Sequence, residues 1–462
     1  MVASAQGRTV VRNLPPPSNE NTTTVELTPP ISPAKSPGAM SLDACIELGF
    51  QYQPALAAAR ASLAASQSGQ RGLNRMILPR LFTPDLGVRR EQACHGVTIA
   101  EAALMQAEWE TRYAITRNFF TVQYIRSQQV VVKDVLRSLE EGYKKAEKLY
   151  EAGDPAAKIT KIDLDAIKIQ IALVKGKKSQ ADNGMLKAKA ALREAMGVGH
   201  DYALEIAPVD LPLAVYPAKY YEEKVKVLDD KGKDTSKTTR KELEYTPLFQ
   251  IKKAELIEAA VANRGEMIQA NAASRVTDLE VQAQGRIRGW QGRTFASGAD
   301  PHTQPIPFSI FNTDYRPGAI GLEMPPMLAG RRWDRVQRAR DLNDRASAVV
   351  EKTNNLVSLD VEAQYLKWRE AVEEIQYLKE IYETAQELPE KVLKLVQEKD
   401  LTSTQIIQAN MTAIMVRTSL NEEMHTHALA LAGLERATAG AFRVYPIPAL
   451  PLPVLVPSPK KK

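Results

Sequence analysis

The chain contains an internal duplication, and this feature limits its possible folds more than any other. Pro54 and Pro247 open matching amphipathic segments that lie 193 positions apart. Gly153 and Lys399 follow matching long helical patterns and lie 246 positions apart. The second copy therefore holds about 53 extra residues (246 minus 193) between these landmarks. Because a repeat determines the architecture of the whole chain, both copies should adopt the same basic fold.

Each copy carries a coiled-coil pattern in its long helix. Apolar residues recur with alternating gaps of four and three, which is the spacing of a coiled-coil seam. The seam of the first copy comprises Val132, Leu136, Leu139, Tyr143, Ala146 and Tyr150, and that of the second comprises Val361, Tyr365, Trp368, Val372 and Ile375. We therefore predict a mainly α fold built from long antiparallel helical hairpins in two tandem repeats.

The lengths of the predicted helices suggest how they stack. The opening helices are Leu42–Arg71 and Pro247–Arg275, the long helices Ile99–Ala152 and Val336–Lys399, and the return helices Asp163–Met196 and Thr402–Ala439. At 1.5 Å per residue the long helices span roughly 80 to 95 Å, about the length of one return and one opening helix end to end. This predicts a four-stranded rod in which two strands are continuous and two are stacked pairs.

The composition of the segments suggests the domain organisation. We expect a Pro/Ser/Thr-rich disordered leader at 1–40, a first helical repeat at 41–207, an inter-repeat linker at 208–246, a second helical repeat at 247–440 and a Pro-rich tail at 441–462. The polar, Lys-rich linker should wrap the rod near its middle. The second repeat carries a β-hairpin insert, which we place at 276–326.

Period-two alternation marks the start of that insert. Apolar or small residues from Leu279 to Gly289 alternate with polar and charged ones, which predicts a two-faced strand. A second alternating run follows around Ile320 and Leu322. One interpretation is a surface hairpin on the rod, and the other is a hairpin of a membrane β-barrel. A lone hairpin cannot span lipid with unpaired edges, so the second interpretation requires oligomers that close the barrel.

In sequence order, these elements resemble the TolC-like outer-membrane efflux factors over roughly residues 41–440. The matching elements are Leu42-x-x-x-Ile46-x-Leu48 with Gln53-Pro54-x-Leu56, Tyr150-Glu151-Ala152-Gly153, residues 318–324 with Gly330-Arg331-Arg332, and Leu434-Glu435-Arg436-Ala437-Thr438. The resemblance implies a homotrimeric passive exit duct in the cell outer membrane, projecting into the periplasm. Such a duct serves a tripartite efflux or type I secretion system, docking through a periplasmic membrane-fusion adaptor to an inner-membrane pump.

The resemblance also implies roles for individual residues. The adaptor-facing tips would comprise Gly153, Thr160, Asp400, Leu401 and Thr402, and the gate candidates are Asp163, Asp165, Gln405 and Gln408. Barrel positions facing lipid would be Leu279, Val281, Ile287, Ile320 and Leu322, and those facing the lumen Gln282, Gln284, Arg286 and Arg288. Asp163 and Asp165 also have a simpler interpretation, because acidic residues at a helix start are favoured by the helix dipole.

Three features depart from the family pattern. Where the second copy has over fifty residues, the first has only about fifteen, at 72–86, so its hairpin should be a short remnant. Pro389 should kink the second long helix before its tip. No apolar segment precedes Ala3-Ser4-Ala5, so we expect no signal peptide in the chain as written.

No catalytic or cofactor-binding constellation is evident in the sequence. His425 and His427 are two apart on a predicted helix, so they face different sides, and Cys94-His95 is an isolated pair. The charge of +6 is mostly interleaved with acidic residues, which argues against nucleic-acid binding. We therefore predict no enzyme, cofactor or metal site. The alternative function is a soluble elongated periplasmic coiled-coil scaffold that has lost barrel formation, and nothing selects a drug, metal or protein cargo.

Overall fold

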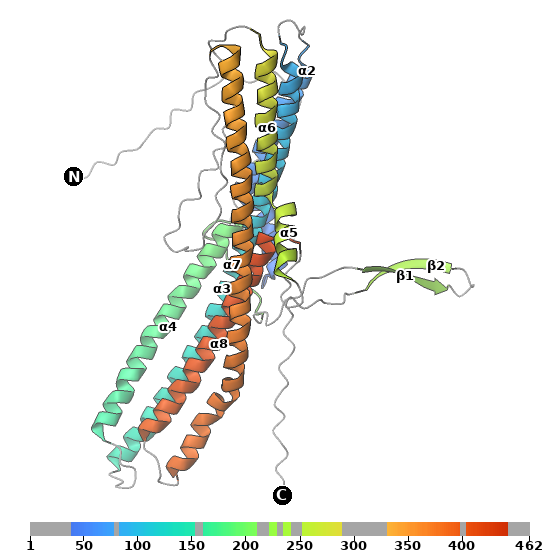
Figure 1. Cartoon of the computed structure of the whole chain (residues 1–462). Coiled ribbons are helices and arrows are strands. Elements are labelled where there is room, and N and C mark those ends of the chain that lie inside the picture. Colours follow the sequence, from blue (N-terminus) through green and yellow to red (C-terminus); the bar gives the residue numbers. More distant parts are fainter. Residues whose placement is uncertain are drawn as a thin grey trace, which may run out of the picture.

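The computed structural model describes residues 38–77, 83–152, 160–209, 221–228, 234–241, 252–288, 330–397 and 403–441. In these ranges, long helices form an elongated rod (Figure 1). The helices are α1 Leu42–Tyr52, α2 Pro54–Arg75, α3 Leu86–Glu151, α4 Lys161–Met196, α5 Lys253–Asn263, α6 Gly265–Arg286, α7 Arg332–Gln397 and α8 Ser403–Ala437. The strands are β1 Tyr221–Leu228 and β2 Asp234–Lys241.

The duplication is confirmed and its register becomes clearer. The long helices α3 and α7 each contain 66 residues, and their starts lie 246 positions apart. Each copy opens with helices of 11 and 22 residues, α1 with α2 and α5 with α6, and these starts lie 211 positions apart. The offset of 193 between Pro54 and Pro247 was therefore wrong. The excess of the second copy is 35 residues (246 minus 211), between α6 and α7.

Each opening segment is two helices rather than the single helix that was predicted. The breaks fall at Gln53 and Arg264, which both have extended backbone conformations. Pro54 takes the first position of α2, where its missing N–H costs no hydrogen bond. The equivalent residue of α6 is Gly265, and an added Cβ would lie 2.6 Å from the carbonyl oxygen of Ala102 on α3. Glycine at this break thus lets α6 begin against the backbone of α3.

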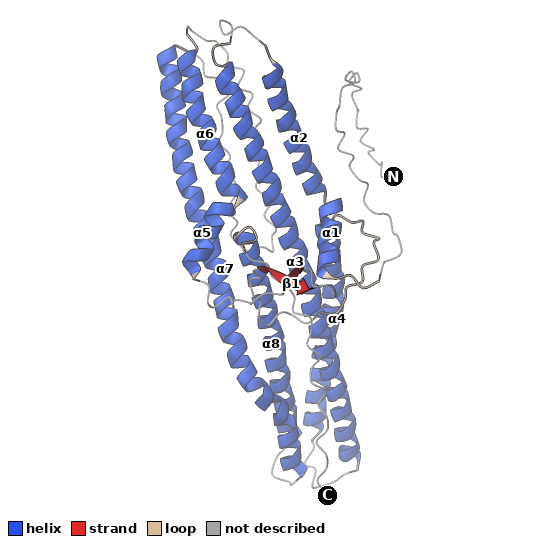
Figure 2. Ribbon diagram, turned by 90° about the vertical axis from the view of Figure 1, so that its right-hand side faces the viewer, coloured by secondary structure: helices blue, strands red, loops and turns tan. Residues whose placement is uncertain are grey.

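The predicted stacking of helices is confirmed. In the upper half of Figure 1, α3 and α7 run with α2 and α6, and in the lower half with α4 and α8. Figure 2 shows the same arrangement from the side. Two helices are therefore continuous along the rod, and the other two positions are each filled by an opening and a return helix placed end to end.

Two apolar clusters hold the middle of the rod together. One contains Phe119 and Phe120 of α3, which are both fully buried. Their rings lie edge to face, with the ring centroids 6.1 Å apart. The other contains Trp368 of α7 and Leu431 and Leu434 of α8. Full burial of each such side chain contributes about 1.5–3 kcal/mol. The rod therefore depends on narrow apolar seams, in keeping with the low aromatic content of 6%.

The strand predicted over 279–289 was wrong for the described residues, which extend to Arg288. Helix α6 continues to Arg286, and Ile287 and Arg288 follow its end. Among the described residues, none of the positions assigned to a barrel wall therefore lies on a strand: Leu279, Val281, Gln282, Gln284 and Arg286 are helical. The other predicted barrel residues, Ile320 and Leu322, lie outside the described residues.

The physical reason for this correction is a polar network inside the helix layer. Leu279, Glu280, Ala283 and Gln284 are all buried, which is a helical spacing. Glu280 and Gln284 are polar, so the period-two pattern placed them on a solvent or lumen face. Arg89 of α3 bonds to Glu280, and Arg335 of α7 bonds to Gln284. These bonds make the burial of the two polar side chains possible.

The inter-repeat linker contains a hairpin that the sequence did not predict. Strands β1 and β2 pair antiparallel, from Tyr221 opposite Lys241 to Leu228 opposite Asp234. The remainder of residues 210–251, the leader before residue 38, the segment 289–329 and the tail after residue 441 lie outside the described residues. The predicted course of the linker around the rod therefore stays a prediction.

Candidate functional site

A capping box formed by Thr160 and Asp163 begins α4, next to the tip of the first helical hairpin. The Thr160 hydroxyl accepts a hydrogen bond from the Asp163 backbone N–H at 3.3 Å. The Asp163 carboxylate in return accepts hydrogen bonds from the Thr160 N–H at 2.9 Å and the Thr160 hydroxyl at 2.7 Å. Residues with this spacing satisfy backbone groups that a helix start leaves unpaired. The geometry thus gives both residues a structural role at the tip.

The remaining tip and gate candidates are placed only in part. Asp165 is exposed on α4, and Gln408 is exposed on α8. Gln405 lies on the helical backbone of α8, and its side chain is outside the description, as are Gly153 and residues 398–402 with Asp400, Leu401 and Thr402. Helices α4 and α8 both pack on α3. The described candidates Asp163, Asp165 and Gln408 therefore lie on two helices that both pack on α3.

The lower half of the rod is a layer with two free edges. Its helices follow the order α4, α3, α8 and α7 (Figures 1 and 2). The substantial contacts of α4 are with α3 and α1, and those of α7 are with α8, α6 and α5. The outer sides of α4 and α7 consequently face away from the rest of the described chain.

Both edges present apolar side chains at helical spacing. On α4, Ile162, Ile169 and Leu173 are exposed and follow one another at intervals of seven and four residues. Beyond Trp333 at its start, the exposed large apolar side chains of α7 are Leu359, Leu366, Tyr377 and Ile381. At 100° per residue, each set falls along one stripe of its helix. Exposed apolar side chains aligned along one face in this way indicate an interaction site on a folded protein.

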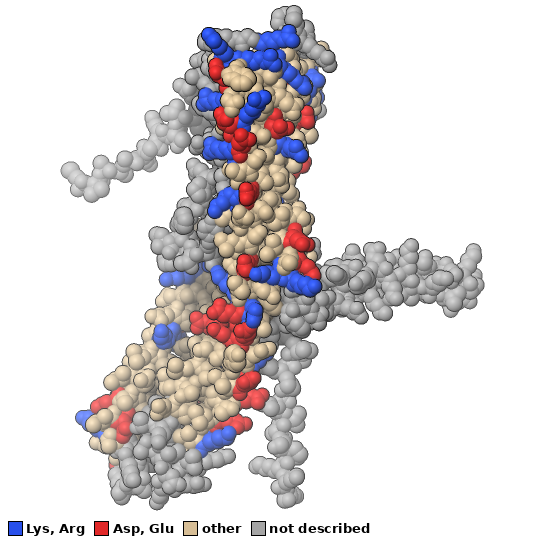
Figure 3. All heavy atoms as spheres, viewed as in Figure 1, with Lys and Arg blue, Asp and Glu red and all other residues tan. Residues whose placement is uncertain are grey.

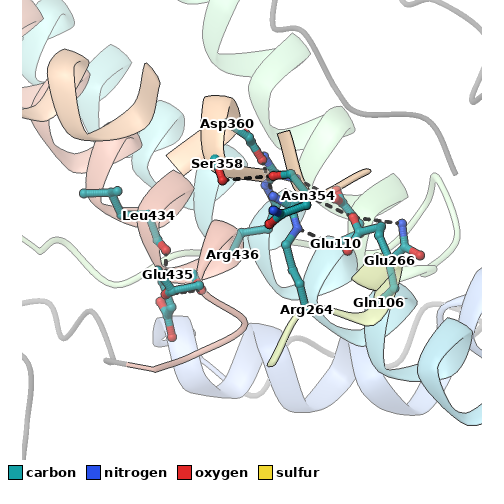
Figure 4. A network of polar contacts seen from close by, with 11 residues as sticks. Gln106, Glu110, Arg264, Glu266, Asn354, Ser358, Asp360, Leu434, Glu435 and Arg436 are labelled. Carbon is teal, nitrogen blue, oxygen red and sulfur yellow. Dashed lines mark hydrogen bonds and ion pairs between the residues drawn. The ribbon is translucent and has the colours of Figure 1, made fainter. Parts of the chain in front are cut away.

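A buried charged network joins four helices at the middle of the rod (Figure 4). Arg264, at the break before α6, donates a hydrogen bond to Asp360 of α7 at 2.7 Å and two bonds to Glu266 at 3.1 Å. Arg436, at the end of α8, donates to the same Asp360 at 2.9 and 3.2 Å and to Glu110 of α3 at 2.8 Å. One aspartate therefore connects the start of α6 to the end of α8.

The electrostatic surroundings of Arg436 favour its charged form. Burial alone would lower the pKa of Arg436, but the charges of Glu110 and Asp360 outweigh burial and raise it. The guanidinium also lies 5.3 Å from the centre of the Tyr113 ring. Arg436 consequently stays protonated inside the rod.

The first copy makes the matching junction with a neutral side chain. Gln53, 211 positions before Arg264, donates to the backbone oxygens of Glu194 at 3.2 Å and Ala195 at 2.9 Å. These oxygens lie near the end of α4, which stops at Gly197 in the left-handed conformation (φ 69°). The residue at the helix break thus bonds directly to the end of the return helix in the first copy, whereas in the second copy Arg264 is linked to the end of α8 through Asp360 of α7.

An acidic group between α7 and α8 was missed by the sequence reasoning. Glu423 of α8 bonds to Glu374 of α7, with Glu370 and Glu422 close by. Partial burial, followed by the charges of these neighbours, raises the pKa of Glu423 to about 7. Figure 3 shows acidic side chains gathered where α7 and α8 cross this face. The spacing Glu370–Glu374 signals one helix face, but only the pairing of two helices reveals the group.

The described residues contain no group of three or more His, Cys, Asp or Glu side chains arranged to hold a metal ion. In the same part of the chain, no helix has both the length and the apolarity needed to cross a bilayer.

Comparisons with known proteins identify the fold. No family model matches the chain, and no curated protein sequence does. Among solved structures, the outer-membrane channel OprN is 12% identical, with a TM-score of 0.63, over 86% of this chain and 90% of that one. VceC from Vibrio cholerae is 15% identical, with a TM-score of 0.61, over 87% and 97%. CmeC from Campylobacter jejuni is 10% identical, with a TM-score of 0.56, over 93% and 94%. The chain has the fold of these outer-membrane channels.

Proposed function

We propose that this chain is the outer-membrane channel component of a tripartite efflux or type I secretion system, a passive exit duct formed by three copies. The single observation that carries this proposal is the open helix layer with an apolar stripe along each edge. A layer of this kind encloses nothing by itself. The shared fold of outer-membrane channels supports the same conclusion.

Closure would occur by contact between unlike edges. The α7 stripe of one copy would pack against the α4 stripe of the next, which is a head-to-tail interface that closes into a ring. Leu173 on α4 and Tyr377 and Ile381 on α7 would then be buried between copies. Coiled-coil packing would continue across each interface, because both stripes have helical spacing.

The tips would carry the contacts with other proteins. Gly153, Thr160 and residues 400–402 would face a periplasmic adaptor, itself joined to an inner-membrane pump. Asp163 and Asp165 from α4 and Gln405 and Gln408 from α8 would narrow the duct where the tips of three copies meet. An acidic ring at this position would favour the passage of cations.

Fractionation and bilayer recording test this proposal together. The full chain, expressed with a bacterial export signal, should appear in the outer membrane as a heat-modifiable trimer with discrete conductance. Leu173→Glu should abolish the trimer, because it places a charge in the interface between copies. Ser179→Glu, on another face of the same helix, should leave the trimer intact. A soluble monomer without conductance would refute the duct and support the alternative scaffold.

A further inference from the structure

The upper end of the rod carries a concentration of arginine, which we name the arginine collar. It comprises the arginines of residues 71–77, 83–91, 282–288 and 330–338. These ranges are the end of α2, the start of α3, the end of α6 and the start of α7. All four helix ends lie together at the top of Figure 1, and Figure 3 shows basic side chains gathered there.

The charge at this end differs from that of the rest of the chain. The four ranges contain ten arginines, no lysine and three acidic residues, a net charge of +7. The whole chain has a net charge of +6. At the opposite end, residues 140–152, 160–170, 387–397 and 403–410 contain eight acidic and seven basic residues. Of the two ends of the rod, only the upper one therefore carries a marked excess of positive charge among the described residues.

Three arginines of the collar have structural roles. Arg90 donates to the backbone oxygens of Leu73 at 3.1 Å and Met76 at 2.7 Å, at the end of α2. Arg335 donates to the backbone oxygen of Ile287 at 3.1 Å, just after α6. Arg89 pairs with Asp85 at 3.0 Å and with Glu280. These bonds join the end of α2 to α3, and the end of α6 to α3 and α7.

The outward-facing arginines require another explanation. Arg75, Arg286, Arg288, Arg331 and Arg332 are exposed. The helix dipole accounts for Arg75 and Arg286, because a cation is favoured at a helix C-terminus. It opposes Arg331 and Arg332, which precede and begin α7, because a cation is disfavoured at a helix N-terminus. An external anion would remove this unfavourable interaction.

Exposed apolar side chains accompany these charges. Trp333, next to Arg332, is 71% exposed, and Ile77, just after α2, is 95% exposed. Tryptophan and arginine together are typical of the boundary between water and a lipid bilayer. A nucleic acid or an acidic protein would explain the arginines and leave the exposed Ile77 unexplained.

We propose that the arginine collar binds the phosphate headgroups of anionic phospholipids at the membrane surface, with Trp333 and Ile77 inserted among the lipids. This proposal rests on the proposed outer-membrane function. Guanidinium groups suit this ligand, because their planar N–H groups bond two phosphate oxygens at once. The described residues that flank the segments 78–82 and 289–329 in the sequence all lie at this same end. The opposite end, with its balanced charge, is left for protein partners.

Native mass spectrometry of the full chain in detergent tests the collar. The micelles are doped in turn with phosphatidylglycerol and with phosphatidylcholine, and retained lipids are counted. We expect selective retention of phosphatidylglycerol that weakens as salt is raised. R331Q/R332Q should bind it about fivefold more weakly for each charge removed. The control K177Q/K187Q removes two exposed charges from α4 and should bind like the wild type.

The outcomes separate this proposal from the proposed function. Equal retention of the two lipids, or equal weakening by both double variants, overturns the collar. Displacement of phosphatidylglycerol by millimolar inorganic phosphate at constant ionic strength also overturns it, because that result shows a general anion site. In each of these cases, conductance of the trimer still supports the duct. Selective retention by a chain without trimer or conductance overturns the duct and leaves lipid binding established.

Discussion

Arg89 and Arg335 lie at equivalent positions of the two repeats, 246 residues apart, and bond to one glutamate–glutamine pair on α6. Arg89 donates to Glu280 at 3.2 Å, and Arg335 donates to Gln284 at 3.0 Å. Gln284 in turn donates to Glu280 at 2.6 Å, which completes a chain of bonds from α3 through α6 to α7. Burial tends to raise the pKa of Glu280, but Arg89, Gln92 and Gln284 outweigh it and lower the pKa. The duplication thus provides two arginines that hold α6 between the long helices.

Glu280→Gln should destabilise the upper half of the rod. Arg89 keeps Asp85 but loses the buried carboxylate, so we expect a loss of about 2 kcal/mol in the free energy of unfolding. Chemical denaturation followed by circular dichroism measures this change. Glu91→Gln, at an exposed position on the same end of α3, serves as the control and should change stability by less than about 0.5 kcal/mol. Equal effects of the two variants would contradict the account.

Asp360→Asn should be more damaging, because two buried arginines share this carboxylate. Replacing it leaves Arg264 and Arg436 undercompensated inside the rod, at a cost of about 3 kcal/mol. The matched control is Glu362→Gln on the same helix, which breaks a half-exposed pair with Lys253 and should cost less than about 1 kcal/mol. The same denaturation assay compares the two. A smaller effect at Asp360 than at Glu362 would show that the network does not hold the junction.

The acidic group between α7 and α8 predicts a pH dependence of stability. Glu423 has its pKa raised from 4.5 to about 7, so between these values the folded protein holds a proton that the unfolded chain has released. Its contribution to stability is therefore complete below pH 4.5 and is lost as the pH rises through about 7. Glu423→Gln should remove this component.

The measurement is the melting temperature of wild type and variant at about pH 5 and about pH 8. The excess stability of the variant should be larger at the higher pH, where Glu423 would otherwise repel Glu374. Glu258→Gln, an exposed position on α5, controls for general charge effects. A difference in melting temperature between wild type and variant that stays constant with pH would contradict the raised pKa of Glu423.

Substitutions of Thr160 and Asp163, the two residues of the capping box, should affect helix stability and conductance differently. Thr160→Ala removes a cap, so amide exchange in the first turn of α4 should become faster by an amount that corresponds to about 1 kcal/mol. Thr160→Ser keeps the hydroxyl oxygen and should restore protection. Asp163→Ala disturbs the same box and also removes a charge, so it should raise conductance if this carboxylate lines the gate. Equal conductance of Thr160→Ala and Asp163→Ala would limit Asp163 to capping.

Helix periodicity predicted most of the fold because long seams repeat over many turns. The seams through Leu139 and Trp368 mark buried faces of α3 and α7, and the lengths of the helices predicted their stacking. The same reasoning missed the breaks at Gln53 and Arg264. Neither residue type disfavours a helix strongly, and both side chains bond to distant parts of the chain, Gln53 to the end of α4 and Arg264 to Asp360 of α7.

The strand prediction failed for a related reason. Alternation counts polar residues as exposed, and Glu280 and Gln284 are buried only because arginines distant in sequence bond to them. The capping box at Thr160 and Asp163 is local, so the acidic helix start was anticipated from the sequence. Proximity of Glu374 and Glu423 depends on the register of α7 against α8, and single-helix patterns do not contain that information.

Pro389 lies within α7, where Figure 1 shows the helix bending in its lower part.

The mass of the full chain in detergent shows whether copies of this chain assemble through their free edges. We expect one species that contains three copies of the 51.1 kDa chain, because the α4 and α7 edges each need a neighbour. Light scattering coupled to size-exclusion chromatography, corrected for bound detergent, gives this mass. A single chain of 51.1 kDa, with both apolar edges stably exposed, would contradict the account.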